Sequence, residues 1–315
     1  MNCVNTAKKV PVRTLIEEFH FEQISGDDSS LNRPILMSDT NRPGLELAGY
    51  FLNSQLKRLI ILGDKEIAYI ETMSQAKQKK CFDFITSDIT PGIIITKNHL
   101  CPPLLEKIAK KKNFPIFRSP LKTYQLIVRV VSFLDEALAE MDCLHGTLLS
   151  VYGKGVLIRG ESGMGKSEIA LELIKRGHQL IADDRVDCYR IHNDLEGRAP
   201  ELLQDMLELR GIGIVNITRM FGISATLPKC EINFEIVLEK YDPKRDYDRV
   251  GIEEKKYTTI LGVKIPSLII PVKEGRSMAV IIESAVTNFR LTEMGLNSAK
   301  EFENRVLDYI VNNKE

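Results

Sequence analysis

The stretch GESGMGKS, from Gly160 to Ser167, constrains the fold and chemistry of this chain more than any other feature. It satisfies the pattern G-x-x-x-x-G-K-[ST], in which backbone amides of a glycine-rich loop converge on phosphate oxygens. Lys166 can reach the β- and γ-phosphates of a nucleotide, and the hydroxyl of Ser167 can ligate Mg²⁺. The predicted nucleotide site comprises Gly160, Glu161, Ser162, Gly163, Met164, Gly165, Lys166 and Ser167.

The residues on either side of this loop fit a strand that leads into a helix. Residues 156–158 form a short apolar run that is typical of a buried strand. After the loop, apolar residues recur at helical spacing, and Gly177 follows two basic residues as expected at a helix end. Such a helix directs the positive end of its dipole at the bound phosphates. Its predicted apolar face consists of Ile169, Ala170, Leu173 and Ile174.

An acidic pair, Asp183 and Asp184, ends the next apolar segment along the chain. Ligands of α/β sheets lie at the carboxyl ends of strands, so the pair is expected near the phosphates. Two carboxylates there can hold Mg²⁺ or accept a proton from an acceptor hydroxyl. The short interval after Lys166, and the absence of a guanine-reading N-K-x-D, disfavour a switch GTPase and favour a kinase-like site.

Length and composition set broad limits on the protein. A chain of 315 residues is long enough for two domains. Its 43 basic and 43 acidic side chains balance, which predicts neither a nucleic-acid partner nor an anionic membrane partner. The six cysteines lack metal-site spacing, and neither a secretion signal nor an apolar run long enough to cross a bilayer is found. We therefore expect a cytoplasmic protein with reduced thiols.

The segments of the first part alternate between strand and helix patterns, which predicts an α/β domain of unclear role over residues 1–130. Two helices are expected, at 102–112 and at 119–141, and the second of them links this domain to the next. A catalytic domain is expected over residues 131–315. The strands predicted for the first part are 33–39, 58–63, 82–88, 92–97 and 114–120.

The second part shows a similar alternation around the phosphate loop. A helix that enters a glycine-broken strand is predicted for 200–217. Two helices are predicted at the end of the chain, over 277–295 and 297–313. The predicted strands are 147–152, 155–159, the strand-turn-strand segment 178–191, 231–241 and 263–273.

Several stretches together resemble the HPr kinase/phosphorylase family, bacterial enzymes that phosphorylate a serine of the phosphocarrier protein HPr. They cover nearly the whole second part in order, whereas the first part matches more loosely, best at LELAGYF. The resemblance implies a P-loop kinase domain similar to that of phosphoenolpyruvate carboxykinases. The stretches are LHGTLLSVYGKGVLIRGESGMGKSE, GHQLIADDRVD, LELRGIGIVNI, YDRVG and PVKEGRSMAVIIESAVTNFR.

The resemblance also implies a reaction and its residues. Asp184 matches the catalytic aspartate that accepts the serine proton in the kinase direction and returns it when inorganic phosphate attacks phosphoserine and pyrophosphate forms. Further catalytic positions match His145, Lys166 and Arg249, and the magnesium ligands match Ser167 and Glu208. Asp183 is an additional candidate ligand.

Two further segments and an assembly are implied by the same resemblance. Residues 207–216 match a signature used in both directions, and residues 270–275 match a segment tied mainly to dephosphorylation. ATP and Mg²⁺ as cofactors, HPr as partner, a homohexamer and control of carbon use follow from the family.

One departure from the family pattern concerns the reverse reaction: either Glu274 points away from the phosphate site, or phosphorolysis is weakened while the kinase activity is kept. Glu274 stands where the family commonly has proline, and a carboxylate near a phosphate site repels anions. Two other functions compatible with the loop are a small-molecule kinase, including a relative of the carboxykinases, and a module that binds ATP without transferring phosphate. The first would need an enclosed acceptor pocket, and the second is disfavoured by Lys166 and Asp184.

Overall fold

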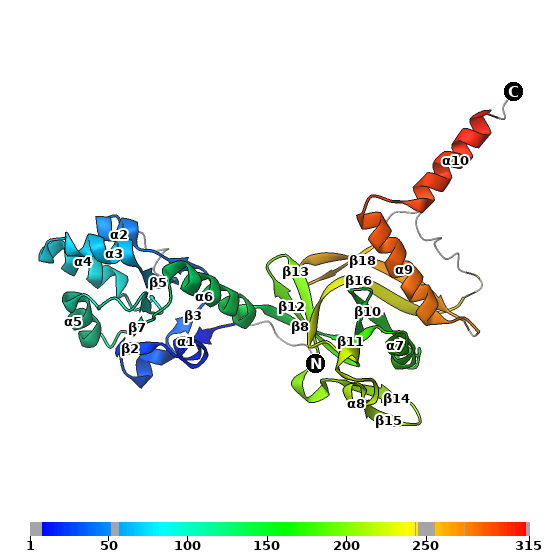
Figure 1. Ribbon diagram of the computed structural model, residues 1–315, viewed down its shortest axis with the longest axis horizontal. Helices are drawn as coiled ribbons and strands as arrows, with labels where there is room; N and C mark the ends of the chain where they lie inside the picture. The colour runs from blue at the N-terminus through cyan, green and yellow to red at the C-terminus, as the bar shows by residue number, and fades with distance from the viewer. Residues whose placement is uncertain (1–7, 52–56, 243, 245–255, 274, 313–315) are drawn as a thin grey trace. The chain divides into compact units, whose positions relative to one another are not determined.

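The computed structural model describes residues 8–51, 57–242, 244, 256–273 and 275–312 and divides into two compact units (Figure 1). One unit spans residues 5–140 and the other, apart from a short N-terminal segment, residues 141–315. The chain passes between them after helix α6 (Thr123–Leu138). Residue 130, where the sequence analysis placed the boundary, lies within that helix.

The first unit is built on a five-stranded sheet with the order β2-β7-β6-β5-β4. Strands β4 to β7 are parallel, and β2 pairs antiparallel with β7. Crossovers between parallel strands need helices, which explains the alternating sequence pattern. The strands are β2 (Glu22–Ser25), β4 (Thr40–Asn41), β5 (Leu59–Leu62), β6 (Ile93–Ile95) and β7 (Ile116–Arg118).

Both faces of this sheet are covered by apolar side chains. Successive residues of β5 point to opposite faces, so Ile60 and Leu62 enter one core and Leu59 and Ile61 the other. The first core is completed by α2 (Gly44–Ala48), α3 (Asp64–Glu71), α4 (Gln75–Ile85) and α5 (Pro103–Lys111). The second is completed by α6, α1 (Val12–Phe19) and the small sheet of β1 (Val10–Pro11) and β3 (Pro34–Ile35). The predicted α/β class is confirmed.

Two strand predictions for this unit need correction. Residues 82–88 are not a strand, because α4 extends through Ile85 and buries Cys81, Phe82 and Ile85 on one helical face. Within the segment 33–39, only Pro34 and Ile35 are in a strand. Because Pro34 has no N–H to donate to a ladder, that strand stays short.

The second unit contains a nine-stranded mixed sheet whose main path runs β11-β9-β10-β16-β13-β12-β8. Strands β10 and β16 are parallel, as are β16 and β18, while β9 is antiparallel to both β10 and β11. The strands are β8 (Glu140–His145), β9 (Thr147–Val151), β10 (Lys154–Gly160), β11 (Gln179–Ala182), β12 (Arg185–Ile191), β13 (Asp194–Arg198), β16 (Lys229–Lys240), β17 (Tyr257–Ile260) and β18 (Val263–Val272).

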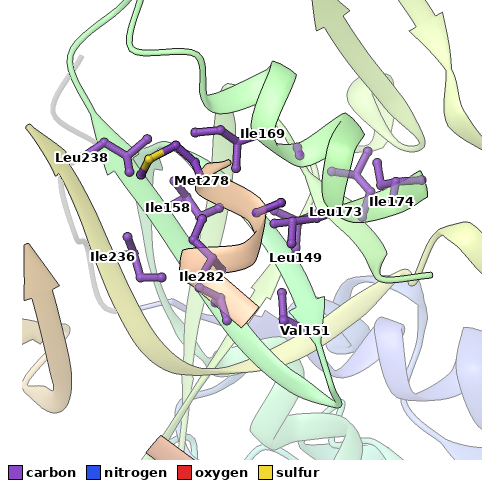
Figure 2. Close-up of a cluster of buried hydrophobic side chains, with 14 of the residues drawn as sticks. Leu149, Val151, Ile158, Ile169, Leu173, Ile174, Ile236, Leu238, Met278 and Ile282 are labelled. Atoms are coloured by element: carbon purple, nitrogen blue, oxygen red, sulfur yellow. The ribbon is translucent and has the colours of Figure 1, made fainter. Parts of the chain in front are cut away.

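Helices α7 (Lys166–Lys175) and α9 (Met278–Glu293) pack on one face of this sheet. Figure 2 shows Ile169 and Leu173 of α7 and Ile282 of α9 among the apolar side chains of β9, β10 and β16. The predicted apolar face of α7 is therefore buried as expected. Because β10 leads directly into the loop before α7, this core fixes both ends of the phosphate loop.

Residues 200–217 differ from the predicted helix and broken strand. They form a short 3₁₀ turn, η3 (Glu201–Leu203), and then an antiparallel hairpin of β14 (Met206–Leu209) and β15 (Gly213–Asn216). Gly211 and Gly213 have φ of 80° and 96°. Glycine adopts such positive values readily, which allows the chain to reverse tightly here. The hairpin leads into α8 (Ile217–Phe221) and η4 (Ile223–Ala225).

The last described helix is α10 (Ser298–Asn312). Within the described ranges, no helix combines the length and the apolar character that a membrane crossing requires.

Candidate active site

The phosphate loop joins the end of β10 to the first turn of α7, as the sequence predicted. Gly160 has φ of 154°, and a Cβ atom there would lie 2.9 Å from the carbonyl oxygen of Leu238 on β16. Gly165 is the residue before α7 and has φ of 82°. Both positions therefore require glycine, one because of a neighbouring strand and the other because of the turn into the helix.

Lys166 lies folded back over the loop. Its side chain is largely buried, and Nζ donates hydrogen bonds to the carbonyl oxygens of Gly160 (3.0 Å) and Glu161 (3.2 Å). These contacts hold a positive charge at the place where the loop would receive phosphate oxygens. A cation held in advance at this place stabilises negative charge without reorganisation during the reaction.

Asp183 is the buried member of the acidic pair, with 5% of its surface exposed. Its Oδ2 accepts a hydrogen bond from the Ser167 hydroxyl (2.9 Å), and its Oδ1 accepts one from the Thr147 hydroxyl (2.6 Å). The backbone N–H of Glu208 also donates to Oδ2, at 3.4 Å. Burial raises the pKa of Asp183, although these hydrogen bonds act in the opposite direction.

Asp184 is the exposed member of the pair, and its backbone is in the left-handed region, with φ of 62°. Its carbonyl oxygen accepts from the backbone N–H of Gly146 (3.1 Å) and from Nδ1 of His145 (2.9 Å). These two contacts fix the unusual backbone conformation of Asp184, and its side chain lines the pocket. Because a carbonyl oxygen only accepts, Nδ1 of His145 carries the hydrogen in this contact.

The β14–β15 hairpin, residues 206–216, contributes two charged residues to the site. Glu208 and Arg210 of this hairpin line one pocket together with the loop and the acidic pair. A Cβ atom at Gly163 would lie 3.3 Å from both terminal nitrogens of Arg210, so this guanidinium lies against the loop. The pocket residues are His145, Ser162, Gly163, Gly165, Lys166, Ser167, Glu168, Asp184, Glu208 and Arg210.

The structure thus brings together most of the predicted site residues. Asp183 lies directly behind this pocket, bonded to Ser167. Met164 differs from its neighbours because its side chain packs into the core beside α7 and α9. Arg249 and Glu274 lie outside the described residues. Within the described ranges, no group of three or more His, Cys, Asp or Glu side chains is arranged to hold a metal ion by itself.

Two family models cover most of the chain. The model described as HPr Serine kinase N terminus matches residues 10–134, and that described as HPr Serine kinase C-terminal domain matches residues 136–306. The chain belongs to the HPr kinase/phosphorylase family. This finding confirms the resemblance drawn from the motifs.

Individual relatives of the HPr kinase/phosphorylase family agree over nearly the full length. The HPr kinase/phosphorylase of Geobacillus thermodenitrificans is 45% identical over 303 residues, which cover 96% of this chain and 97% of the relative. That of Bacillus subtilis is 44% identical with the same coverage. The solved Hpr(Ser) kinase/phosphatase from Coxiella burnetii is 33% identical, covers 49% of this chain and 99% of its own, and has a TM-score of 0.45.

Two residues of this HPr kinase/phosphorylase site were missed by sequence reasoning. Thr147 holds Asp183 from the first residue of β9, and its local sequence gives no sign of that contact. Arg210 lies within the signature segment 207–216, but the sequence analysis gives it no role of its own. The alternation of Glu208 and Arg210 on either side of buried Leu209 was the available signal, because a period of two places both charges on one face of a strand.

Proposed function

We propose that this protein transfers the γ-phosphoryl group of ATP to a serine of HPr and also catalyses phosphorolysis of the phosphoserine by inorganic phosphate. The observation that supports the proposal is the meeting of Lys166, the Ser167–Asp183 pair and Asp184 in and directly behind a single pocket. A phosphate clamp, a metal-binding pair and an exposed base are the parts that phosphoryl transfer requires. The family relatives carry the name of this reaction.

In the kinase direction, the serine hydroxyl attacks the γ-phosphorus, the bond to the β-phosphate oxygen breaks, and ADP leaves. Asp184 accepts the hydroxyl proton, a role that suits its exposed carboxylate. Lys166 stabilises the charge on the transferring group, and Arg210 supplies a second positive charge beside the loop. Each role is performed by a residue that lines the same pocket.

In the reverse direction, an oxygen of inorganic phosphate attacks the phosphorus of phosphoserine. The bond to the serine oxygen breaks, pyrophosphate forms, and Asp184 returns the proton to that oxygen. The same residue serves both directions because the serine oxygen loses its proton in one direction and regains it in the other. His145, Arg249 and residues 270–275 are assigned further roles by the family resemblance alone.

The residues around Ser167 fit a magnesium ion. The Ser167 hydroxyl and Oδ2 of Asp183 lie 2.9 Å apart, and Glu208 lines the adjoining pocket. Mg²⁺ commonly takes one or two protein oxygens and completes its shell with water and substrate phosphates, so a three-residue protein cage is not required. The ion would neutralise phosphate charge there, while Ser167 and Asp183 hold it.

The wider setting of the activity is also proposed. A homohexamer is assigned by the family resemblance and is tested by light scattering coupled to size-exclusion chromatography. A cytoplasmic location agrees with the use of ATP and with the five described cysteines, which are thiols rather than disulfides. Control of carbon use follows only if HPr is the acceptor.

One experiment separates this function from a small-molecule kinase and from a non-catalytic ATP-binding module. The protein is incubated with labelled ATP, Mg²⁺ and either HPr or HPr that lacks its target serine. Label is expected on intact HPr and not on the form that lacks the target serine. If neither form gains label, the proposal is wrong. Phospho-HPr and inorganic phosphate are then supplied, and Glu274→Gln is expected to raise the yield of pyrophosphate if its charge repels the anions.

A further inference from the structure

The tip of the β14–β15 hairpin carries two exposed isoleucines next to the active site. Ile212 is 73% exposed and Ile214 is 69% exposed. Large apolar side chains at such exposure are common singly, but adjacent ones beside a functional pocket indicate an interaction surface. The position of the two isoleucines relative to the pocket indicates which kind of partner they contact.

The hairpin joins these isoleucines directly to the catalytic pocket. Ile214 is the cross-strand partner of Glu208, so the two side chains share the exposed face of the hairpin. Ile212 lies in the turn, two residues after Arg210. Glu208 and Arg210 both line the pocket. The two isoleucines therefore lie beside the pocket that an acceptor must enter.

The base of the hairpin is firmly held, whereas its tip has little support. Leu207 and Leu209 are buried in the core beside α7, and the N–H of Glu208 bonds to Asp183. In the described part of the chain, β14 and β15 pair only with each other. A two-stranded ribbon is marginally stable alone, so a partner that covers the tip would also order Arg210 against the loop.

We propose that Ile212 and Ile214 form a docking surface for the acceptor protein, and that they contact an apolar patch flanking its target serine. This inference rests on the proposed function, because it takes the acceptor to be HPr. Contact at the tip fixes the hairpin that carries Glu208 and Arg210, so acceptor docking and the phosphate site are linked through one element. A small-molecule acceptor would have no use for such a surface.

The test uses the full-length double variant Ile212→Ser/Ile214→Ser and a matched control, Ile89→Ser/Leu100→Ser. The control replaces two exposed apolar residues of the first unit. Initial rates of HPr phosphorylation are measured at saturating ATP, together with HPr binding, ATP-analogue binding, thermal unfolding and solution mass. We expect KM and Kd for HPr to rise about tenfold or more in the hairpin variant alone. Affinity for the ATP analogue and thermal stability should match the wild type.

Three outcomes would overturn the docking surface. Unchanged HPr binding in the hairpin variant, with an active wild type, shows that the isoleucines do not contact the acceptor. A lower solution mass of that variant shows that they contact another copy of this chain. A wild type that neither binds nor phosphorylates HPr refutes the proposed function, and with it the partner named here.

Discussion

The hydroxyl of Ser167 donates a 2.9 Å hydrogen bond to Oδ2 of Asp183. This bond joins the first turn of α7 to the residue that follows β11. In the sheet, β9 separates β11 from β10, the strand that leads into the loop before α7. We propose that this hydroxyl and this buried carboxylate hold the metal ion of a bound nucleotide. The two adjacent aspartates therefore have different surroundings, because Asp183 bonds to Ser167 whereas Asp184 lines the pocket.

Replacing Asp183 by asparagine should raise the Mg²⁺ concentration needed for half-maximal transfer by about 10- to 100-fold. The amide keeps the shape of the side chain but loses the charge that attracts the ion. The Mg²⁺ dependence of initial rates measures this effect. A variant with wild-type Mg²⁺ dependence would contradict the assignment of Asp183 to the metal.

The same variant should also change how stability depends on pH. Burial raises the pKa of Asp183 above 3.8, so the folded state binds a proton that the unfolded chain releases. The free energy of unfolding therefore falls as pH rises from 3.8 through the raised pKa. Asp183→Asn lacks this loss, and its thermal unfolding without nucleotide and Mg²⁺ should show a weaker decline over that range. An unchanged decline would show that Asp183 is not its source.

Replacing Asp184 by asparagine should lower transfer in both directions by about 10²- to 10⁴-fold, because we propose that this one carboxylate takes and returns the serine proton. ATP affinity should change little, since the exposed Asp184 side chain makes no hydrogen bond to the loop in the described structure. Rates of HPr phosphorylation and of pyrophosphate formation are compared with those of Asp194→Asn, an exposed aspartate at the start of β13. Equal activity of the two variants would contradict the role of Asp184.

Arg210→Gln should lower kcat/KM for ATP by about 10- to 100-fold, because it removes a cation that lies against the phosphate loop. The matched control is Arg219→Gln, an exposed arginine of α8 outside the pocket. Steady-state kinetics at saturating HPr give the measurement. Similar values for both variants would show that Arg210 does not act on the nucleotide.

The strand–loop–helix unit could be predicted because local pattern and chemistry agree there. The apolar spacing of Ile169 and Leu173 gives the helix, and the glycines are required by the loop itself. The hairpin could not be predicted in the same way. Its strands pair through Glu208 and Ile214, and leucines before Gly211 suit a helix equally well until the core that buries them is known.

The different surroundings of Asp183 and Asp184 could not be predicted either, because they depend on tertiary contacts. The sequence places Asp183 and Asp184 at a strand end but does not distinguish the inward from the outward side chain. The contact of Thr147 with Asp183 and the contact of His145 with the Asp184 carbonyl make that distinction. The error at residues 82–88 has a local cause, because Phe82 and Ile85 suit either a strand or the last turn of a helix.

Glu283→Gln should weaken the attachment of α9 to the end of α7. Glu283 accepts hydrogen bonds from Arg176 (2.7 and 2.9 Å) and lies 2.9 Å from Nε2 of His178. The bond with Arg176 lowers the pKa of Glu283 below 4.5, so its contribution is present above pH 4.5 and is lost on further acidification. Urea unfolding at pH 7 should show a loss of about 1 kcal/mol. A variant as stable as the wild type at pH 7 would contradict this.

Gly160→Ala tests whether the junction of β10 and the loop limits the nucleotide site. The added Cβ would lie 2.9 Å from the Leu238 carbonyl oxygen, and φ of 154° is unfavourable for alanine, so β10 and β16 must separate or the loop must shift. Gly177→Ala is the matched control, since it has φ of 94° but no atom within 4 Å of its Cβ. Both variants should lose about 1 kcal/mol or more of stability in urea unfolding. Only Gly160→Ala should also weaken binding of an ATP analogue, because only this residue joins the loop to the strand beneath it. Equal ATP-analogue binding by the two variants would show that the loop keeps its geometry without close contact to β16.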